Sequence, residues 1–282
     1  MYRKAWKGGR GGWVTTIVTE ALSAAATSLT EADSSWADAR RDSLSALESL
    51  SGFAASPDAL VRIFRVYIRC LEDYTVDSRG DIGRIVREAA LSRIGAAFSD
   101  RAQDDVNGLK TNGKSEAMEQ EDSAGKITGS VWIADDLLLL AVKKLIQQCS
   151  EKIDSRKVAA EVLASVQHME NSSATNLHAL PHLSLLQEIF PPCVPGTGNA
   201  VTGVNGDRKV SGFAPHPAVK WMSASETFPR IVRLLSCPEY QHHALLGMIV
   251  SAGGLTESTM RAASSALLEF IERSNKIQMN SS

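Results

Sequence analysis

The chain has 282 residues, of which 44% are hydrophobic and 22% are charged, and its formal net charge is -2. This composition is typical of a globular protein that buries a substantial core, as one large domain or two modest ones, and excludes a chain that is disordered throughout. The near-neutral charge indicates no basic surface for nucleic acid, so no nucleic-acid partner is expected.

The N-terminal segment MYRKAWKGGRGGW is positively charged, but the apolar stretch of a signal peptide does not follow it. No apolar run approaches the length needed to cross a bilayer. The four cysteines are widely separated and form no C-x-x-C pair, which is typical of reduced thiols. We therefore expect a soluble, intracellular protein that has no membrane partner.

Apolar residues recur at helical spacing from the start of the chain. Residues 14–25 follow the i, i+3, i+4 pattern that places apolar side chains on one face of a helix. Residues 60–71 repeat the pattern after Ser56-Pro57-Asp58, a start signal because proline fits the first turn of a helix. Residues 82–94 show it again. Packing in a core explains each of these stripes.

The segment before the third stripe contains the tripeptide Arg79-Gly80-Asp81, which resembles a cell-adhesion signal. A motif this short often occurs by chance, and adhesion would require an extracellular loop. We interpret the segment as the lead-in to a helix, with Ser78-x-x-Asp81 as a capping box. Arg84 and Glu88 are spaced for an i, i+4 ion pair on that helix.

Two polar stretches interrupt the helical pattern. Residues 99–129 contain few large apolar side chains to offset the entropy of ordering, which predicts a flexible insert. Residues 191–217 are rich in proline and glycine, which predicts a long loop. The predicted organisation is helical repeats (1–98), polar flexible insert (99–129), helical repeats (130–190), Pro/Gly-rich loop (191–217), C-terminal helices (218–273) and tail (274–282).

The C-terminal region continues the helical pattern. The stretch HHALLGMIVSAGGL is apolar almost all round and stops at Gly253-Gly254, as expected for a buried helix with a glycine C-cap. Thr256 can cap the last helix. About ten helical segments in pairs, without alternating strand patterns, predict an all-α fold, an armadillo- or HEAT-like α-solenoid of helical hairpins, with a compact helical bundle as the alternative.

The sequence shows no constellation for catalysis or metal binding. His178 and His182 have a spacing that suits zinc, but Pro181 lies between them, and the adjacent His242-His243 point in different directions on a helix. The glycines at 8–12 lack the lysine and hydroxyl of a Walker loop, and no G-x-S-x-G frames a nucleophile. We predict no catalytic residues, no metal and no cofactor.

Four segments resemble one known family. They are DYTVDSRGDIGRIVREAAL (73–91), CSEKIDSRKVAAEVL (149–163), LPHLSLLQEIFP (180–191) and WMSASETFPRIVRLLSCPEYQHHALLGMIVSAGGLTEST (221–259). They are similar, in the same order, to the C-terminal region of the tubulin folding cofactor D family, the tubulin-specific chaperones D. Members of that family are much longer, so this chain is expected to correspond to their C-terminal part.

The resemblance implies an α-helical repeat protein that acts after the cytosolic chaperonin. Such a protein binds β-tubulin, helps to join it to α-tubulin in the αβ-tubulin dimer together with cofactors C and E, and stimulates GTP hydrolysis by tubulin. It also binds an Arf-like small GTPase. The chain would then be a cytoplasmic, cytoskeleton-associated chaperone and not an enzyme, because a scaffold can accelerate hydrolysis by positioning a partner's own groups.

We predict that Arg79, Asp81, Arg84 and Arg87 bind the partner. The neighbouring glycines allow close approach of the backbone, and a cluster of arginines suits an acidic partner, as tubulin is expected to be. One alternative is a general HEAT-type adaptor without tubulin specificity. Another is a hydrolase with an unfamiliar helical active site, although the sequence shows no pairing of a nucleophile with a base.

Overall fold

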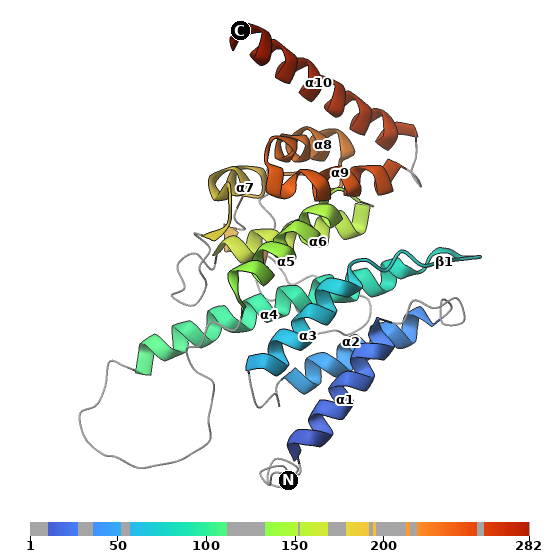
Figure 1. Ribbon diagram of the computed structural model, residues 1–282, viewed down its shortest axis with the longest axis vertical. Helices are drawn as coiled ribbons and strands as arrows, with labels where there is room; N and C mark the ends of the chain where they lie inside the picture. The colour runs from blue at the N-terminus through green and yellow to red at the C-terminus, as the bar shows by residue number, and fades with distance from the viewer. Residues whose placement is uncertain are drawn as a thin grey trace. The chain divides into compact units, whose positions relative to one another are not determined.

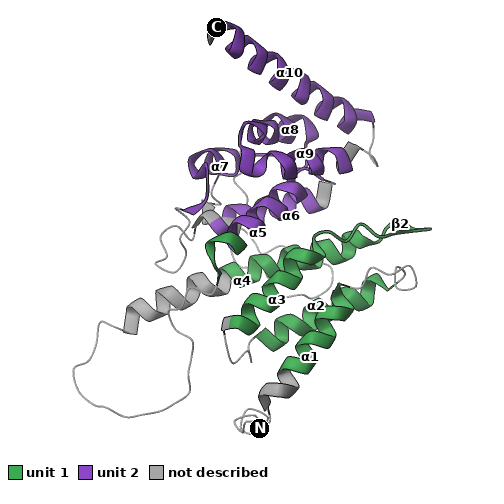
Figure 2. Cartoon of the chain, in the orientation of Figure 1, with its two compact units in different colours: residues 1–137, 171–176 green, residues 138–170, 177–282 purple. Residues whose placement is uncertain are grey.

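The computed structural model describes residues 11–27, 36–51, 57–111, 133–151, 153–168, 179–191, 194–195, 213–214, 219–252 and 257–281. Within these residues the chain forms ten α-helices, one 3-10 helix and two short strand pairs (Figure 1). The predicted fold class, an all-α helical-repeat protein, is confirmed. The chain divides into unit 1, residues 1–137 with 171–176, and unit 2, residues 138–170 with 177–282 (Figure 2).

Unit 1 contains the helices α1 (Gly11–Ala26), α2 (Ala37–Ser51), α3 (Pro57–Cys70) and α4 (Gly83–Thr111). Helix α1 packs on α2 and α3, and both of these pack on α4. Phe64 and Phe98 meet edge to face in this core, with ring centroids 5.6 Å apart. The main buried apolar side chains are Leu44, Leu47, Ile63, Phe64, Leu71, Val86, Leu91, Ile94 and Phe98.

The predicted start of α3 is confirmed, because the helix begins at Pro57 and carries Asp58 in its first turn. Helix α4 continues to Thr111, although the polar insert was expected to begin at residue 99. Five of the thirteen residues in 99–111 are good helix formers, and each residue that continues an existing helix adds a backbone hydrogen bond, so propagation extends α4 even though the other eight residues have lower propensity. Residues 112–129 of the predicted insert lie outside the described residues.

Two short strand pairs occur where the sequence predicted no strands. Strands β1 (Val76–Asp77) and β2 (Gly80–Asp81) pair antiparallel between α3 and α4. Strands β3 (Val194–Pro195) and β4 (Phe213–Ala214) pair antiparallel within the predicted Pro/Gly-rich loop. A strand of two residues is too short to show an alternating pattern, so hydrophobic periodicity cannot detect it.

Unit 2 contains most of α5 (Asp135–Cys149), followed by α6 (Ile153–His168), α7 (Leu183–Ile189), α8 (Ala224–Ile231), η5 (Val232–Ser236), α9 (Pro238–Ala252) and α10 (Glu257–Ser281). Helix α10 packs on α8, η5 and α9. Phe190 stacks on Trp221, with ring centroids 5.1 Å apart. No helix in the described ranges combines the length and apolar character that crossing a membrane requires.

Helix α9 packs closely on the end of α5. A Cβ atom at Gly247 would lie 2.2 Å from the backbone oxygen of Gln147, so only glycine fits at this contact. The glycines predicted to cap α9 and the predicted cap Thr256 lie outside the described residues. Helix α10 continues to Ser281 through most of the predicted tail, and the i, i+4 pair of Arg273 with Glu269 lies in the turn just before that tail.

Candidate functional site

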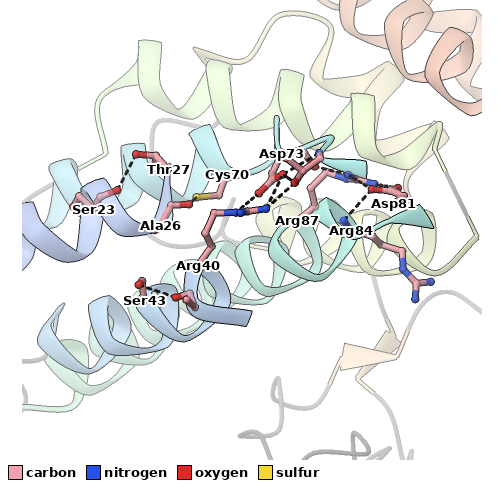
Figure 3. Close-up of polar contacts among 12 residues, drawn as sticks. Ser23, Ala26, Thr27, Arg40, Ser43, Cys70, Asp73, Asp81, Arg84 and Arg87 are labelled. Carbon is pink, nitrogen blue, oxygen red and sulfur yellow. Dashed lines mark hydrogen bonds and ion pairs between the residues drawn. The ribbon is translucent and has the colours of Figure 1, made fainter. Parts of the chain in front are cut away.

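The candidate site is the connection between α3 and α4, residues 71–83, together with the side chains of α2 and α4 that hold it. Figure 3 shows Arg40 and Arg87 pointing toward Asp73 and Asp81, with the side chain of Arg84 directed away from them. All of these residues belong to unit 1. We refer to this region as the α3–α4 connection.

The outer part of the connection is the β1–β2 hairpin, in which Ser78 and Arg79 form the turn. The Asp77 carboxylate accepts hydrogen bonds from the backbone nitrogen of Arg79 at 2.7 Å and from its Nε at 2.9 Å. The side-chain bond from Arg79 lowers the pKa of Asp77. Gly80 follows with φ 105°, a conformation that other residues rarely adopt. These contacts and the glycine fix the turn that presents Arg79.

Asp73 lies at the base of the connection and is 2% exposed. Its carboxylate accepts two hydrogen bonds from Arg40 of α2, 2.8 Å from Nε to Oδ2 and 3.4 Å from Nη2 to Oδ1. The Thr75 backbone nitrogen donates to Oδ1 at 3.1 Å, and Arg40 Nη2 donates to Thr75 Oγ1 at 2.7 Å. Such a pair withstands burial because several hydrogen bonds replace the lost water. It ties α2 to the connection.

Arg87 of α4 is a second buried arginine, 1% exposed. It donates to the backbone oxygen of Asp73 and, through both terminal nitrogens, to the Asp81 carboxylate, with Nη1 to Oδ1 at 3.2 Å and Nη2 to Oδ2 at 2.8 Å. Its guanidinium carbon lies 4.5 Å from the centroid of the Tyr74 ring, within the range of a cation–π contact. Arg87 therefore ties α4 to both ends of the hairpin.

Asp81 also begins α4. Its Oδ1 accepts a hydrogen bond from the backbone nitrogen of Arg84 at 3.1 Å, which is the contact of an N-cap. The predicted capping box is therefore wrong, because Ser78 lies in the hairpin turn and Asp81 itself supplies the cap. The i, i+4 pair of Arg84 with Glu88 is confirmed, with Nε 3.6 Å from Oε1.

Gly83 lies where the hairpin returns to α4. Its backbone nitrogen donates to the backbone oxygen of Thr75 at 3.0 Å. A Cβ atom at this position would lie 2.2 Å from the backbone oxygen of Asp73 and 2.6 Å from its Oδ1. Backbone cannot move aside like the end of a flexible side chain, so the close approach requires glycine.

The four predicted partner-binding residues occupy two different environments. Arg87 and Asp81 form the inner ion pair, with side chains 1% and 14% exposed, which holds the hairpin. Arg79 and Arg84 face solvent, with side chains 64% and 42% exposed. Val76, which the sequence analysis did not single out, is 67% exposed on the same hairpin. Contact with a partner stays a prediction, and Arg79 and Arg84 are placed to make it.

Unit 2 repeats this use of arginine at the corner between α5 and α6. Arg156 of α6 is 1% exposed and donates from Nε and Nη2 to the backbone oxygen of Glu151, at 3.0 and 2.7 Å. Its guanidinium carbon lies 5.1 Å from the centroid of the Phe228 ring, and burial lowers the pKa of Arg156. Arg87, near the start of α4, donates to the backbone oxygen of Asp73, which follows α3. Arg156, near the start of α6, donates in the same way to the backbone oxygen of Glu151, which follows α5.

Among the histidines whose side chains the structure describes, His182, His242 and His243, no arrangement suits shared coordination of a metal ion. The rings of His242 and His243 lie edge to face, with centroids 5.3 Å apart. His182 lies 3.3 Å from Glu239 and has the left-handed backbone conformation, φ 54°. His178 lies outside the described residues. Within the described ranges, no three His, Cys, Asp or Glu side chains gather in a group that could hold a metal ion.

Cys70 lies close to Asp73, and its thiol donates to the backbone oxygen of Ala26 at 3.4 Å. Burial, with a smaller contribution from Asp73, raises the pKa of Cys70 to about 12, and burial raises the pKa of Cys149. Both thiols therefore stay protonated at pH 8, whereas iodoacetamide attacks the thiolate. We expect neither cysteine to be alkylated in the native chain and both to be alkylated in urea, as measured by mass spectrometry of peptides. Rapid labelling of either native thiol would contradict this arrangement.

The fold and the candidate site define a helical-repeat protein, a class that binds other proteins through extended surfaces. The family model described as "Tubulin folding cofactor D C terminal" matches residues 140–282, and the chain belongs to this family. It is 24% identical over 198 residues to the tubulin-specific chaperone D of Dictyostelium discoideum, covering 70% of this chain and 11% of that protein. No solved structure matches the chain. The resemblance predicted from the four segments is confirmed.

Proposed function

We propose that this chain binds β-tubulin as the C-terminal part of a tubulin chaperone. The observation that carries this proposal is the match of residues 140–282 to the tubulin folding cofactor D family. The related protein from Dictyostelium discoideum is named as a tubulin-specific chaperone, and its region similar to this chain is 11% of its length. The test is therefore whether this chain, which matches the C-terminal region of the family, binds β-tubulin by itself.

The α3–α4 connection is the proposed contact surface. Val76 and Arg79 are exposed on the β1–β2 hairpin, and Arg84 is exposed in the first turn of α4; buried ion pairs hold the base of this region. Arginine is enriched at protein interfaces, and its guanidinium can bind a carboxylate through two hydrogen bonds. A surface that is already ordered also loses little entropy on binding. These properties suit an acidic partner, with Asp81 and Arg87 positioning the hairpin and not contacting the partner.

The wider activity of the family extends this proposal. In the extended proposal, the chain works with cofactors C and E in assembling the αβ-tubulin dimer. It also stimulates GTP hydrolysis by tubulin and binds an Arf-like small GTPase. The partner protein binds the GTP, and the chain accelerates hydrolysis by orienting the partner's own catalytic groups. The corresponding location is the cytoplasm, in association with the cytoskeleton.

The test is co-elution of the purified chain with αβ-tubulin on a sizing column, at low and at physiological salt. We expect a shared peak, and we expect the double variant Arg79→Glu with Arg84→Glu to weaken capture at least about tenfold, because both substitutions place like charges against an acidic surface. Arg65→Glu is the matched control, since Arg65 is also an exposed arginine of unit 1 but lies on α3. Circular dichroism should show the same helix content for all variants.

Each other outcome has a definite meaning. Separate peaks at both salt concentrations would contradict tubulin binding by this chain. A shared peak that the double variant does not change would move the contact away from the hairpin. Equal capture of an unrelated acidic protein would favour a general helical-repeat adaptor without tubulin specificity.

A further inference from the structure

Helix α3 carries three exposed arginines, Arg62, Arg65 and Arg69, which follow one another at spacings of three and four residues. We refer to them as the arginine stripe. We propose that the arginine stripe binds a short acidic peptide segment of a second partner protein. This inference goes beyond the proposed function, because it concerns the body of α3 and not the α3–α4 connection, and a partner other than tubulin.

The arginine stripe lies on the side of α3 that faces solvent. At about 100° of rotation and 1.5 Å of rise per residue, its three positions fall within an arc of roughly 60° and extend over roughly 10 Å. The buried residues of α3 centre on the opposite side of the helix and include Ile63, Phe64, Tyr67 and Ile68. The stripe is therefore a continuous basic ridge that takes no part in the core.

The three guanidinium groups have no partner within the part of the chain that the structure describes. They make neither a hydrogen bond nor an ion pair there. Exposed arginines of other helices form i, i+4 pairs with glutamate, namely Arg84–Glu88, Arg261–Glu257 and Arg273–Glu269. The arginine stripe thus keeps its hydrogen-bond donors for another molecule.

The stripe is also unfavourable for the stability of α3 itself. Arg65 lies three residues after Arg62 and four residues before Arg69, and like charges at these spacings on a helix repel each other. Side chains that repel each other and support no contact within the fold are typical of a functional surface, because such a surface sacrifices stability for binding.

The chemistry of the stripe suits a run of carboxylates. A guanidinium group binds a carboxylate through two parallel hydrogen bonds. Successive arginines of the stripe are separated along the helix axis by about 4.5 and 6 Å. Alternate side chains of an extended peptide are separated by about 6.6 Å, a difference that the long arginine side chains can accommodate. An extended acidic segment can therefore place one carboxylate against each arginine.

Acidic residues bound the stripe at both ends, which favours a short segment. Asp58 lies in the first turn of α3, four residues before Arg62, and Glu72 lies just beyond the end of the helix. Both would repel a polyanion that extends past the stripe. Nucleic-acid binding is moreover typical of a strongly basic domain, and membrane binding of about four to eight clustered basic residues, whereas this chain has a net charge of -2.

The first test is fluorescence anisotropy of a labelled peptide of about eight glutamates, titrated with the whole chain at low and at physiological salt. We expect saturable binding that weakens as salt is added, and no binding of the same peptide with glutamine in place of glutamate. Arg65→Glu should weaken binding at least about tenfold, because it removes a donor and adds a like charge. Arg261→Glu is the matched control, since it changes the net charge equally at an exposed arginine of α10.

The second test separates binding from folding. Arg65→Glu should keep the helix content and move the midpoint of urea unfolding to a higher concentration, because a glutamate at this position attracts Arg62 and Arg69. Weaker binding together with higher stability would show that the stripe serves a partner and not the fold. A lower midpoint would contradict the repulsion on which the proposal depends.

Three results would overturn the proposal: no binding of the peptide at low salt, an equal loss of binding in Arg261→Glu, or tighter binding of duplex DNA or phosphatidylserine vesicles than of the peptide. The variants also separate this surface from the one proposed for tubulin. The double variant Arg79→Glu with Arg84→Glu should keep peptide binding, just as Arg65→Glu should keep tubulin capture. The peptide titration contains no tubulin, so its outcome is independent of the co-elution test.

Discussion

Replacing Asp73 by alanine is expected to lower the free energy of unfolding by about 3–5 kcal/mol. The substitution leaves the Arg40 guanidinium buried at 1% exposure without the carboxylate that now faces it at 2.8 Å. It also removes an acceptor from the Thr75 backbone nitrogen. Urea unfolding followed by far-UV circular dichroism measures the loss, with Arg84→Ala, an exposed change in the same unit, as the control.

A second variant separates the lost ion pair from lost packing. Arg40→Met combined with Asp73→Leu removes both charges and keeps apolar volume, so we expect it to recover most of the stability lost in Asp73→Ala. A loss below about 1 kcal/mol in Asp73→Ala would mean that water reaches Arg40, and would contradict the buried pair.

Gly83→Ala is expected to destabilise the chain by about 1–3 kcal/mol. Glycine to alanine within an exposed helix normally stabilises by up to about 1 kcal/mol, so the sign of the effect is itself diagnostic. Gly83→Ala should destabilise instead, because the new Cβ would lie 2.2 Å from the backbone oxygen of Asp73. The same unfolding measurement applies, and tubulin capture should fall as the hairpin is displaced.

Gly80→Ala provides a comparison with a different cause. A Cβ at Gly80 would meet nothing within 4 Å, but φ 105° is unfavourable for alanine, so a cost of roughly 1–2 kcal/mol from backbone strain alone is expected. Gly80→Ala should leave the Arg40–Asp73 pair intact.

For Gly83→Ala, a free energy of unfolding equal to that of the unmodified chain would show that the α3–α4 connection is not packed as described.

The helices could be predicted because their signals are local. The apolar stripes of α3 and α4 and the start of α3 at Pro57 are read from residues within two or three turns of each other. The ends of α4 and α10 were harder to place, since both helices continue through polar sequence without a clear apolar stripe. The four-residue ladder of β1 and β2 could not be predicted from hydrophobic periodicity at all.

The site was predicted only in part, for a related reason. The Arg84–Glu88 pair lies within one helix turn, whereas Arg40 and Asp73 are 33 residues apart and meet only through the packing of α2. One signal did exist. Arg40 lies at helical spacing among buried residues of α2, and Arg87 lies likewise among buried residues of α4. An arginine on an apolar stripe predicts a buried partner, although it does not say which carboxylate that partner is.

In the proposed contact with a partner, the two arginines that hold the α3–α4 connection would also determine how the hairpin recognises another molecule. Its orientation cannot change without breaking the Arg40–Asp73 or the Arg87–Asp81 ion pair. Induced fit in the proposed contact would therefore be costly, and a partner would need a matching shape before the encounter. Selectivity would then arise because the fixed hairpin cannot adjust to acidic surfaces of the wrong shape. A flexible loop could adjust to such surfaces and would discriminate less.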